Sequence, residues 1–204
     1  EQNFDALENT WNKIWPYLKN IVKNLEWINL GGGHHITRSD YNLNKLTEFL
    51  LDLKTKTNCQ IILEPGEAIV FQSGILVGEI LDYIRGDNNK IPNIGITDIS
   101  PVCHMPDVIE APYKPLLMNE PIKGKKVVLG GPSCLAGDII GEYNFLKNPK
   151  IGDKVVFLDQ AHYTLVKTNF FNGINHPEVV LWNSNNNDLK VIKSFDFKDF
   201  EKRN

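Results

Sequence analysis

The chain has 204 residues, of which 42% are hydrophobic and 23% are charged, and its formal net charge is −3 at pH 7. These values are typical of a soluble globular protein with one large domain or two small ones. The small negative charge gives no reason to expect nucleic acid or an anionic membrane as a partner, and no apolar run reaches the length of a membrane span.

Cysteine and histidine residues give no metal or disulfide signature. Cys59, Cys103 and Cys134 stand at unrelated spacings that build neither a disulfide framework nor a zinc knuckle. Free thiols suit a reducing compartment, so we expect a cytoplasmic protein. His34 and His35 are adjacent and seldom point at one ion, which favours structural or substrate-contact roles over a metal site.

Residues 1–69 predict alternating helices and strands. Apolar residues at helical spacing from Phe4 to Leu25 predict an amphipathic helix. Pro16 lies inside it, where proline disfavours a regular helix. Short buried strands are predicted over 27–30 and 60–63, and between them a helix that Ser39 or Asp40 caps. Strand, helix, strand implies parallel pairing, so the loops that follow both strands share one edge.

Two of these loops could bind a ligand. The three glycines at 31–33 let backbone N–H groups approach an anion, most often a phosphate, although a glycine run is more often only a tight turn. Glu64 follows the second strand and precedes Pro65 and Gly66. It is either a carboxylate at the mouth of a ligand site or a solvated loop charge.

Residues 70–204 read mostly as strands, interrupted by an irregular segment with five prolines between Pro101 and Pro121. Such a segment forms neither a central strand nor a long helix, and it is usually functional. It contains Asp107 and Glu110, which would face the same way on one helical turn.

Cys134 follows a strand-like run over 126–129 and a Gly-Gly-Pro break, and Asp138 comes four residues later. A thiol on such a tight loop can be a nucleophile or a proton donor. The alternative for a lone cysteine is a small buried side chain in a structural turn.

The chain contains four sequence motifs in order: Gly31-Gly32-Gly33, Glu64-Pro65-Gly66, Gly131-Pro132-Ser133-Cys134…Gly137-Asp138, and Gly152-Asp153…Asp159-Gln160-Ala161-His162-Tyr163-Thr164. Together they resemble the motifs of the fold-type III decarboxylases, which are alanine racemase-like and use pyridoxal 5′-phosphate. The residues in these motifs are most similar to those of the carboxynorspermidine/carboxyspermidine decarboxylase branch, which serves polyamine biosynthesis, and the likeness runs over essentially the whole chain.

The resemblance implies a TIM-type β/α barrel followed by a β-rich barrel or sandwich, and a homodimer with shared active sites. Residues 1–69 would be the later part of the barrel and residues 70–204 the β-rich domain. Within the latter we call residues 98–118 the specificity segment and residues 130–138 the cysteine loop.

The resemblance also implies roles for the cofactor-binding residues. The backbone of the loop at 31–33 would hold the cofactor phosphate, and Tyr163 would give that phosphate a hydroxyl. Glu64, with Gly66 in the same motif, would pair with the protonated pyridine nitrogen. Cys134 would protonate the substrate carbon in the partner subunit's site after CO₂ leaves, and Asp138, the closing Asp of the motif, is grouped with it as catalytic.

Glu67 and Glu110 stand where diaminopimelate decarboxylases, which this chain resembles less closely, carry Arg that recognise a distal carboxylate. The reversed charge suits a distal ammonium group. We therefore expect Glu67 and Glu110, with Asp98, His104 and Asp107, to contact carboxynorspermidine or carboxyspermidine.

The family's Schiff-base Lys lies on the first barrel strand, and no Lys here stands in that context. The sequence also opens with Glu1 and not with Met. We therefore expect a C-terminal half, inactive alone, whose partner is an N-terminal barrel half that carries the Lys.

Three alternatives remain open. The first is a diaminopimelate- or arginine-type decarboxylase; Glu67 and Glu110 argue against the diaminopimelate type. The second is a non-catalytic half-barrel that binds or regulates a partner. The third is a thiol hydrolase that pairs Cys134 with His104 or His162.

Overall fold

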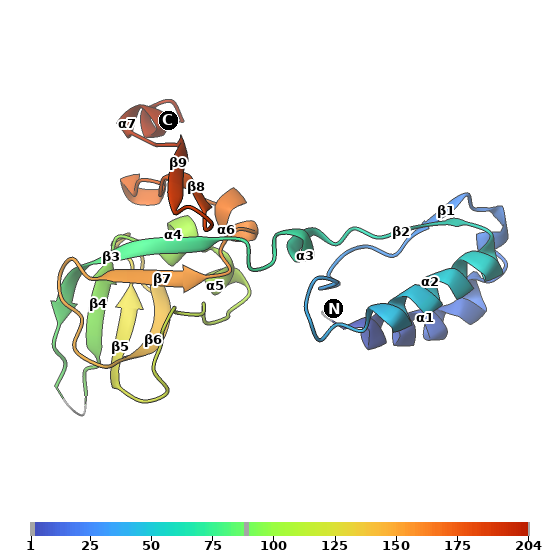
Figure 1. Ribbon diagram of the computed structural model, residues 1–204, viewed down its shortest axis with the longest axis horizontal. Helices are drawn as coiled ribbons and strands as arrows, with labels where there is room; N and C mark the ends of the chain where they lie inside the picture. The colour runs from blue at the N-terminus through green and yellow to red at the C-terminus, as the bar shows by residue number, and fades with distance from the viewer. Residues whose placement is uncertain (1–2, 88–89, 204) are drawn as a thin grey trace. The chain divides into compact units, whose positions relative to one another are not determined.

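The computed structural model describes residues 3–87 and 90–203, and its chain forms two compact units that meet in sequence between Phe71 and Gln72. Figure 1 shows the elements of each unit. The division lies close to the boundary expected between residues 69 and 70. Each unit has a hydrophobic cluster of its own, so each is described by itself.

The first unit pairs two parallel strands with two helices. Its elements in chain order are α1 (Phe4–Leu18), the 3₁₀ helix η1 (Val22–Asn24), β1 (Trp27–Asn29), α2 (Leu43–Thr57), β2 (Gln60–Ile62) and the short α3 (Gly66–Val70). Ile28 lies opposite Ile61 in the parallel ladder, which confirms the predicted pairing. The loops after β1 and β2 therefore leave the same edge of the sheet.

Both long helices differ in detail from the prediction. Pro16 is accommodated inside α1, which ends at Leu18 rather than continuing to Leu25. The cap of α2 is Asn42, whose side chain accepts a hydrogen bond from the Lys45 N–H (3.0 Å), so the predicted caps Ser39 and Asp40 are wrong. Phe4 packs edge-on against Phe49, with ring centroids 5.5 Å apart, and joins the two helices.

The second unit is built on a five-stranded sheet of order β6-β5-β4-β3-β7. Its strands are β3 (Ile75–Ile84), β4 (Asn93–Thr97), β5 (Lys125–Gly130), β6 (Ile139–Phe145) and β7 (Lys154–Leu158). The N-terminal half of β3 pairs antiparallel with β7, and its C-terminal half pairs antiparallel with β4. Strand β4 is parallel to β5, which is antiparallel to β6. Because β3 changes partner midway, the sheet turns a corner there.

The remaining elements are short. They are α4 (Pro101–His104), α5 (Asp107–Glu110), α6 (Tyr163–Val166), η2 (Phe171–Gly173), the hairpin of β8 (Val179–Asn183) and β9 (Asp188–Lys193), and α7 (Phe197–Glu201). The proline-rich segment thus holds two four-residue helices, as expected for a segment that cannot form a central strand. Within the described ranges, none of the helices is long and apolar enough to cross a membrane.

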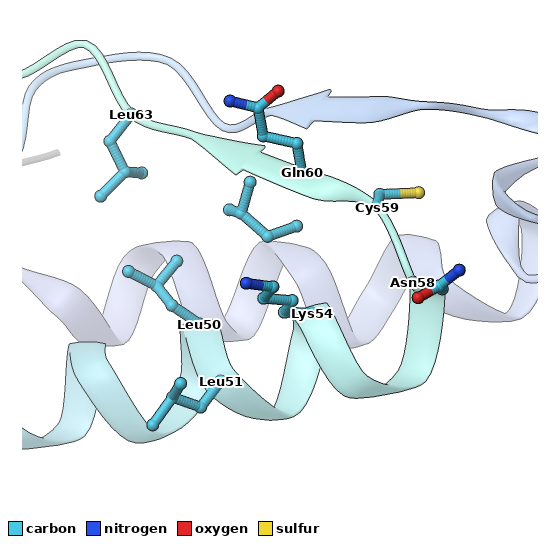
Figure 2. Close-up of a pocket in the computed structure, with 8 residues that line it drawn as sticks. Leu50, Leu51, Lys54, Asn58, Cys59, Gln60 and Leu63 are labelled. Atoms are coloured by element: carbon cyan, nitrogen blue, oxygen red, sulfur yellow. The ribbon is translucent and has the colours of Figure 1, made fainter.

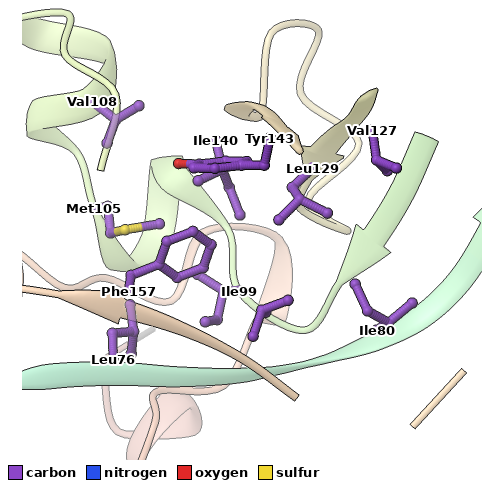
Figure 3. Close-up of a cluster of buried hydrophobic side chains, with 11 residues drawn as sticks. Leu76, Ile80, Ile99, Met105, Val108, Val127, Leu129, Ile140, Tyr143 and Phe157 are labelled. Carbon is purple, nitrogen blue, oxygen red and sulfur yellow. The ribbon is translucent and has the colours of Figure 1, made fainter. Parts of the chain in front are cut away.

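The core of the second unit lies on one face of the sheet and ties the specificity segment to it (Figure 3). Met105 and Val108 pack there with residues from β3, β5, β6 and β7; the cluster is Leu76, Ile80, Ile99, Met105, Val108, Val127, Leu129, Ile140, Tyr143, Val155 and Phe157. Full burial of one such apolar side chain contributes about 1.5–3 kcal/mol. The Tyr143 hydroxyl donates to the Pro115 carbonyl (2.9 Å), so a second point of the specificity segment is fixed.

Candidate active-site loops

The two loops that follow β1 and β2 lie directly against each other. The Glu64 N–H donates to the Gly31 carbonyl (2.8 Å), extending the ladder beyond the strands. A Cβ added to Gly32 would lie 2.4 Å from the Glu64 carbonyl oxygen, so only glycine allows this approach. The glycine loop and Glu64 therefore come together at the predicted edge of the sheet.

Asn29, which the sequence reading missed, links these two loops through its side chain. Its Oδ1 accepts the Gly31 N–H (2.8 Å), and its Nδ2 donates to Glu64 Oε1 (2.7 Å). The Gly31 N–H is therefore engaged within the protein. An anion bound by this loop would have to use later N–H groups, such as those of Gly32 and Gly33.

Glu67 lies on the first turn of α3 and faces a buried histidine. Its Oε2 is 3.7 Å from Nε2 of His35, a ring that is 5% exposed and packs edge-on against Phe71. His34 contacts the Tyr41 hydroxyl through Nδ1 (2.9 Å). Both histidines therefore pack inside the first unit. In the parts of the chain that the structure describes, no group of three His, Cys, Asp or Glu side chains could hold a metal ion.

A cavity of about 560 Å³ also lies in this unit, between α2 and β2 (Figure 2). Its lining is Leu50, Leu51, Lys54, Asn58, Cys59, Gln60, Ile61 and Leu63. None of the predicted site residues is among these, and the lining contains no carboxylate or histidine. Because of this lining, the cavity is not a candidate for the catalytic site.

In the second unit, Cys134 is exposed on the cysteine loop, whereas Cys59 of the first unit and Cys103 are buried. The alternative of a buried structural thiol therefore does not hold for Cys134. Its φ of 62° lies in the left-handed region, which non-glycine residues rarely adopt. The loop that follows β5 thus presents this thiol to the surface in a constrained backbone conformation.

Asp138 organises the cysteine loop from inside. It is 4% exposed, and its Oδ1 accepts the Ser100 hydroxyl (2.8 Å) and the Val102 N–H (3.2 Å). Its Oδ2 accepts the N–H (3.2 Å) and the hydroxyl (2.5 Å) of Ser133. Both carboxylate oxygens are occupied by the protein itself. In this structure Asp138 therefore supports the cysteine loop, and its grouping with Cys134 as catalytic stays a prediction.

His104 and Asp98 are also engaged internally. His104 is 1% exposed; its Nδ1 accepts the Ser100 N–H (3.1 Å), and its Nε2 lies 2.9 Å from the Asn175 carbonyl. The ring proton therefore belongs on Nε2, and burial lowers the pKa of the imidazole. Asp98 accepts the Glu79 N–H (2.7 Å). A substrate contact is not supported for His104, whose polar atoms are both used.

Asp107 and Glu110 do face the same way, as predicted, and a lysine lies between them. The Lys167 ammonium donates to Asp107 Oδ1 and to Glu110 Oε2 (2.9 Å). These hydrogen bonds, the one to Asp107 first, raise the pKa of Lys167. The same ammonium lies 5.5 Å from the ring centroid of half-exposed Tyr163.

A cavity of about 350 Å³ opens beside this cluster. Its lining is Val102, Pro106, Ile109, Glu110, Lys167 and Asn169. Three predicted site residues, Asp107, Glu110 and Tyr163, are thus brought together around one ammonium group. Lys167 was not identified from the sequence, because this residue lies 57 residues from Glu110 and no local sequence pattern predicts such a contact.

The chain has the fold seen in part of the fold-type III decarboxylases of known structure. A crystal structure of a carboxynorspermidine decarboxylase from Campylobacter jejuni, complexed with norspermidine, superposes with a TM-score of 0.89 and 39% identity; the match covers 100% of this chain and 58% of that one. An arginine decarboxylase from Paramecium bursaria Chlorella virus shares the fold, with a TM-score of 0.69 and 20% identity over 86% of this chain and 50% of its own.

Sequence comparison points to the same proteins. A carboxynorspermidine/carboxyspermidine decarboxylase from Campylobacter jejuni is 39% identical over 100% of this chain and 56% of its own length, in its C-terminal part. A carboxyaminopropylagmatine decarboxylase from Synechocystis is 34% identical over 100% of this chain and 52% of its own length. The chain thus spans about half the length of these relatives. No family model matches it.

Proposed function

We propose that this chain is part of a pyridoxal 5′-phosphate-dependent decarboxylase that converts carboxynorspermidine or carboxyspermidine to norspermidine or spermidine. The main support is the 39% identity to a decarboxylase of that name over the whole chain. The arrangement of carboxylates described above adds to it, because acidic side chains suit a substrate with cationic amines.

The residues at the edge of β1 and β2 fit such a cofactor. The glycine loop exposes backbone beside the Glu64 carboxylate, and the hydrogen bond from the Glu64 N–H to the Gly31 carbonyl keeps the two loops together. The N–H groups of Gly32 and Gly33 would hold the phosphate, and Glu64 would hold the protonated pyridine nitrogen. Tyr163 is proposed to donate its hydroxyl to the phosphate. When bound, the cofactor supplies an electron sink as CO₂ leaves.

The distal amines of the substrate would be bound by Glu67, Asp107 and Glu110. An ammonium group, that of Lys167, already lies between Asp107 and Glu110 in this structure, so their spacing suits a primary ammonium. Charge-assisted hydrogen bonds of this kind are roughly twice as strong as neutral ones. They would favour an amine over the distal carboxylate of diaminopimelate.

Cys134 is proposed to deliver the proton that replaces CO₂. Its exposure makes the thiol available to a substrate, and the homodimer with shared active sites that the resemblance implies would place it in the partner subunit's site. A cytoplasmic location is proposed for the same protein because a reduced thiol is needed.

The test is decarboxylation by the longer protein that carries the Schiff-base Lys, with four substrates in parallel. We expect CO₂ release to be fastest with carboxynorspermidine or carboxyspermidine, slower with carboxyaminopropylagmatine, and slowest with diaminopimelate. Glu110→Arg should raise KM for the preferred substrate, whereas the control Glu48→Arg, on the exposed face of α2, should not.

The first two alternative functions predict different results in the same assay. A preference for diaminopimelate or arginine would identify the other decarboxylase types. Absence of CO₂ release from every substrate, with no change in the absorbance of added pyridoxal 5′-phosphate, would favour the non-catalytic binding protein. Against that alternative stands the presence together of Glu64, Cys134 and Tyr163, which a purely structural partner does not need.

A further inference from the structure

The backbone of Cys134 is held in a conformation that it would not keep by itself. Its φ of 62° is unfavourable for a side chain with a Cβ, and such a residue persists there only where its surroundings hold it. Other left-handed positions of the described chain are mostly asparagine or glycine, which tolerate the region. Some contact near Cys134 must therefore supply the constraint.

Ser133, the residue before Cys134, supplies that constraint through three polar groups. It is 0% exposed, and its N–H and hydroxyl both donate to Asp138 Oδ2. Its carbonyl, which belongs to the peptide that leads into Cys134, accepts a hydrogen bond from Nδ2 of Asn172 (2.6 Å). Asn172 is thus the one member of this set that comes from outside the cysteine loop.

Asn172 is itself firmly placed. It lies in η2 with φ 52° and ψ 26°, a conformation that suits asparagine. Nearby, Asn169 accepts the Phe171 N–H (2.9 Å) through its side chain and donates from Nδ2 to the Val102 carbonyl (2.7 Å). The Val102 N–H in turn donates to Asp138. These contacts close a ring that runs from the cysteine loop through the specificity segment to η2 and back.

We infer that Asn172 is a positioning residue for Cys134. By holding the Ser133 carbonyl it keeps the next residue in the left-handed conformation, and so determines where the thiol lies. This inference rests on the proposed function, in which Cys134 delivers a proton to a carbon atom. Delivery of that proton depends on where the thiol lies relative to the carbon, so loss of the Asn172 contact should impair the proton step more than substrate binding.

The first experiment compares Asn172→Asp and Asn172→Gly with wild type in the 204-residue chain. Both replacements tolerate the left-handed region, and both remove the amide that donates to Ser133. The control is Asn187→Gly, at an asparagine with φ 54° in the β8–β9 turn. Amide hydrogen exchange at Ser133 and Leu135, whose N–H groups donate to Asp138 Oδ2 and to the Ser133 hydroxyl (3.4 Å), should rise about tenfold or more in both Asn172 variants, and the control should match wild type. Alkylation of Cys134 by iodoacetamide should quicken in the same variants.

The second experiment measures kcat and KM of the longer, cofactor-loaded protein. Asn172→Asp should lower kcat by about tenfold or more with KM nearly unchanged, because the contact serves the proton step. Exchange at Ser133 and Leu135 that stays at the wild-type rate in both variants would overturn the inference. Faster exchange with unchanged kcat would also overturn it, and would show in addition that Cys134 is not the proton donor. If the wild-type longer protein showed no decarboxylase activity, the proposed function would be refuted, whereas the exchange result would still test the role of Asn172.

Discussion

One amide side chain, that of Asn29, joins the two loops to which the proposal assigns opposite ends of the cofactor. Its two hydrogen bonds fix the orientation of the amide, because the Gly31 N–H requires an acceptor and Glu64 requires a donor. The rotamer of Glu64 is therefore restrained before any ligand arrives. Pre-organisation of this kind lowers the entropic cost of binding.

Replacement of Asn29 tests this link. Asn29→Ala should lower the free energy of unfolding of the first unit by about 1–2 kcal/mol, since each lost hydrogen bond contributes about 0.5–1.5 kcal/mol. Urea unfolding followed by tryptophan fluorescence suits the measurement, because Trp11, Trp15 and Trp27 lie in this unit. Asn44→Ala, at an exposed position of α2, is the control. Equal stability of the two variants would contradict the role given to Asn29.

Lys167 occupies the position between two carboxylates that the proposal assigns to a substrate amine. Lys167→Met should therefore tighten the binding of norspermidine to the chain by about tenfold, because an internal competitor for charge-assisted hydrogen bonds is removed. Isothermal titration measures this directly. Lys114→Met is a matched control, since Lys114 also bonds a carboxylate, Glu120, and lies over an aromatic ring. Weaker binding by Lys167→Met would show that the lysine helps to build the site.

At the scale of elements, the specificity segment is held by short helices whose own hydrogen bonds are few. Helices α4 and α5 are four residues each, too short to be stable by themselves. Met105 and Val108 anchor them in the core of the sheet, and His104 connects α4 to the Asn175 carbonyl. The position of Asp107 and Glu110 thus depends on tertiary packing of the segment, more than on helix propensity.

His104 should make the stability of this element depend on pH. Burial lowers its pKa from the ordinary 6.5, so the folded state binds fewer protons than the unfolded state. Stability is therefore full above about pH 7 and falls as the pH drops below about 6.5, where the unfolded state gains a proton that the folded state resists. Urea unfolding across this range should show a flatter profile for His104→Gln than for wild type. A profile for His104→Gln that is as steep as that of wild type would show that His104 is not the cause.

At the scale of the whole molecule, the chain carries its candidate groups on two separate compact units. The glycine loop, Glu64 and Glu67 belong to the first, and Cys134, Glu110 and Tyr163 to the second. The proposed homodimer would share these groups between subunits, which a mixing experiment can test.

The experiment mixes Glu64→Ala and Cys134→Ala variants of the longer protein, each nearly inactive alone. If each site draws Glu64 from one subunit and Cys134 from the other, mixed dimers contain one intact site. Activity should then recover to about a quarter of wild type after subunit exchange. No recovery, with exchange confirmed by differently tagged subunits, would indicate that both residues of a site come from one subunit.

The sequence by itself determined the local features of this protein. The periodicity of hydrophobic residues predicted the strands and helices, and the positions of glycine and proline predicted the loops at the strand ends. These signals are readable because they act between residues that are near in sequence. The motifs at Gly31, Glu64 and Cys134 were visible for the same reason. Helix ends were less certain: Asn42 caps α2, although Ser39 and Asp40 were equally plausible in the sequence.

Only the tertiary structure decided which polar groups are occupied. The sequence suggested Asp138 and His104 as site residues. Packing buries both, and their polar atoms form hydrogen bonds with Ser100, Ser133 and Asn175. Lys167 and Asn172 enter through contacts with partners far along the chain. Such contacts depend on how the sheet brings distant segments together, and no residue type or local spacing encodes that.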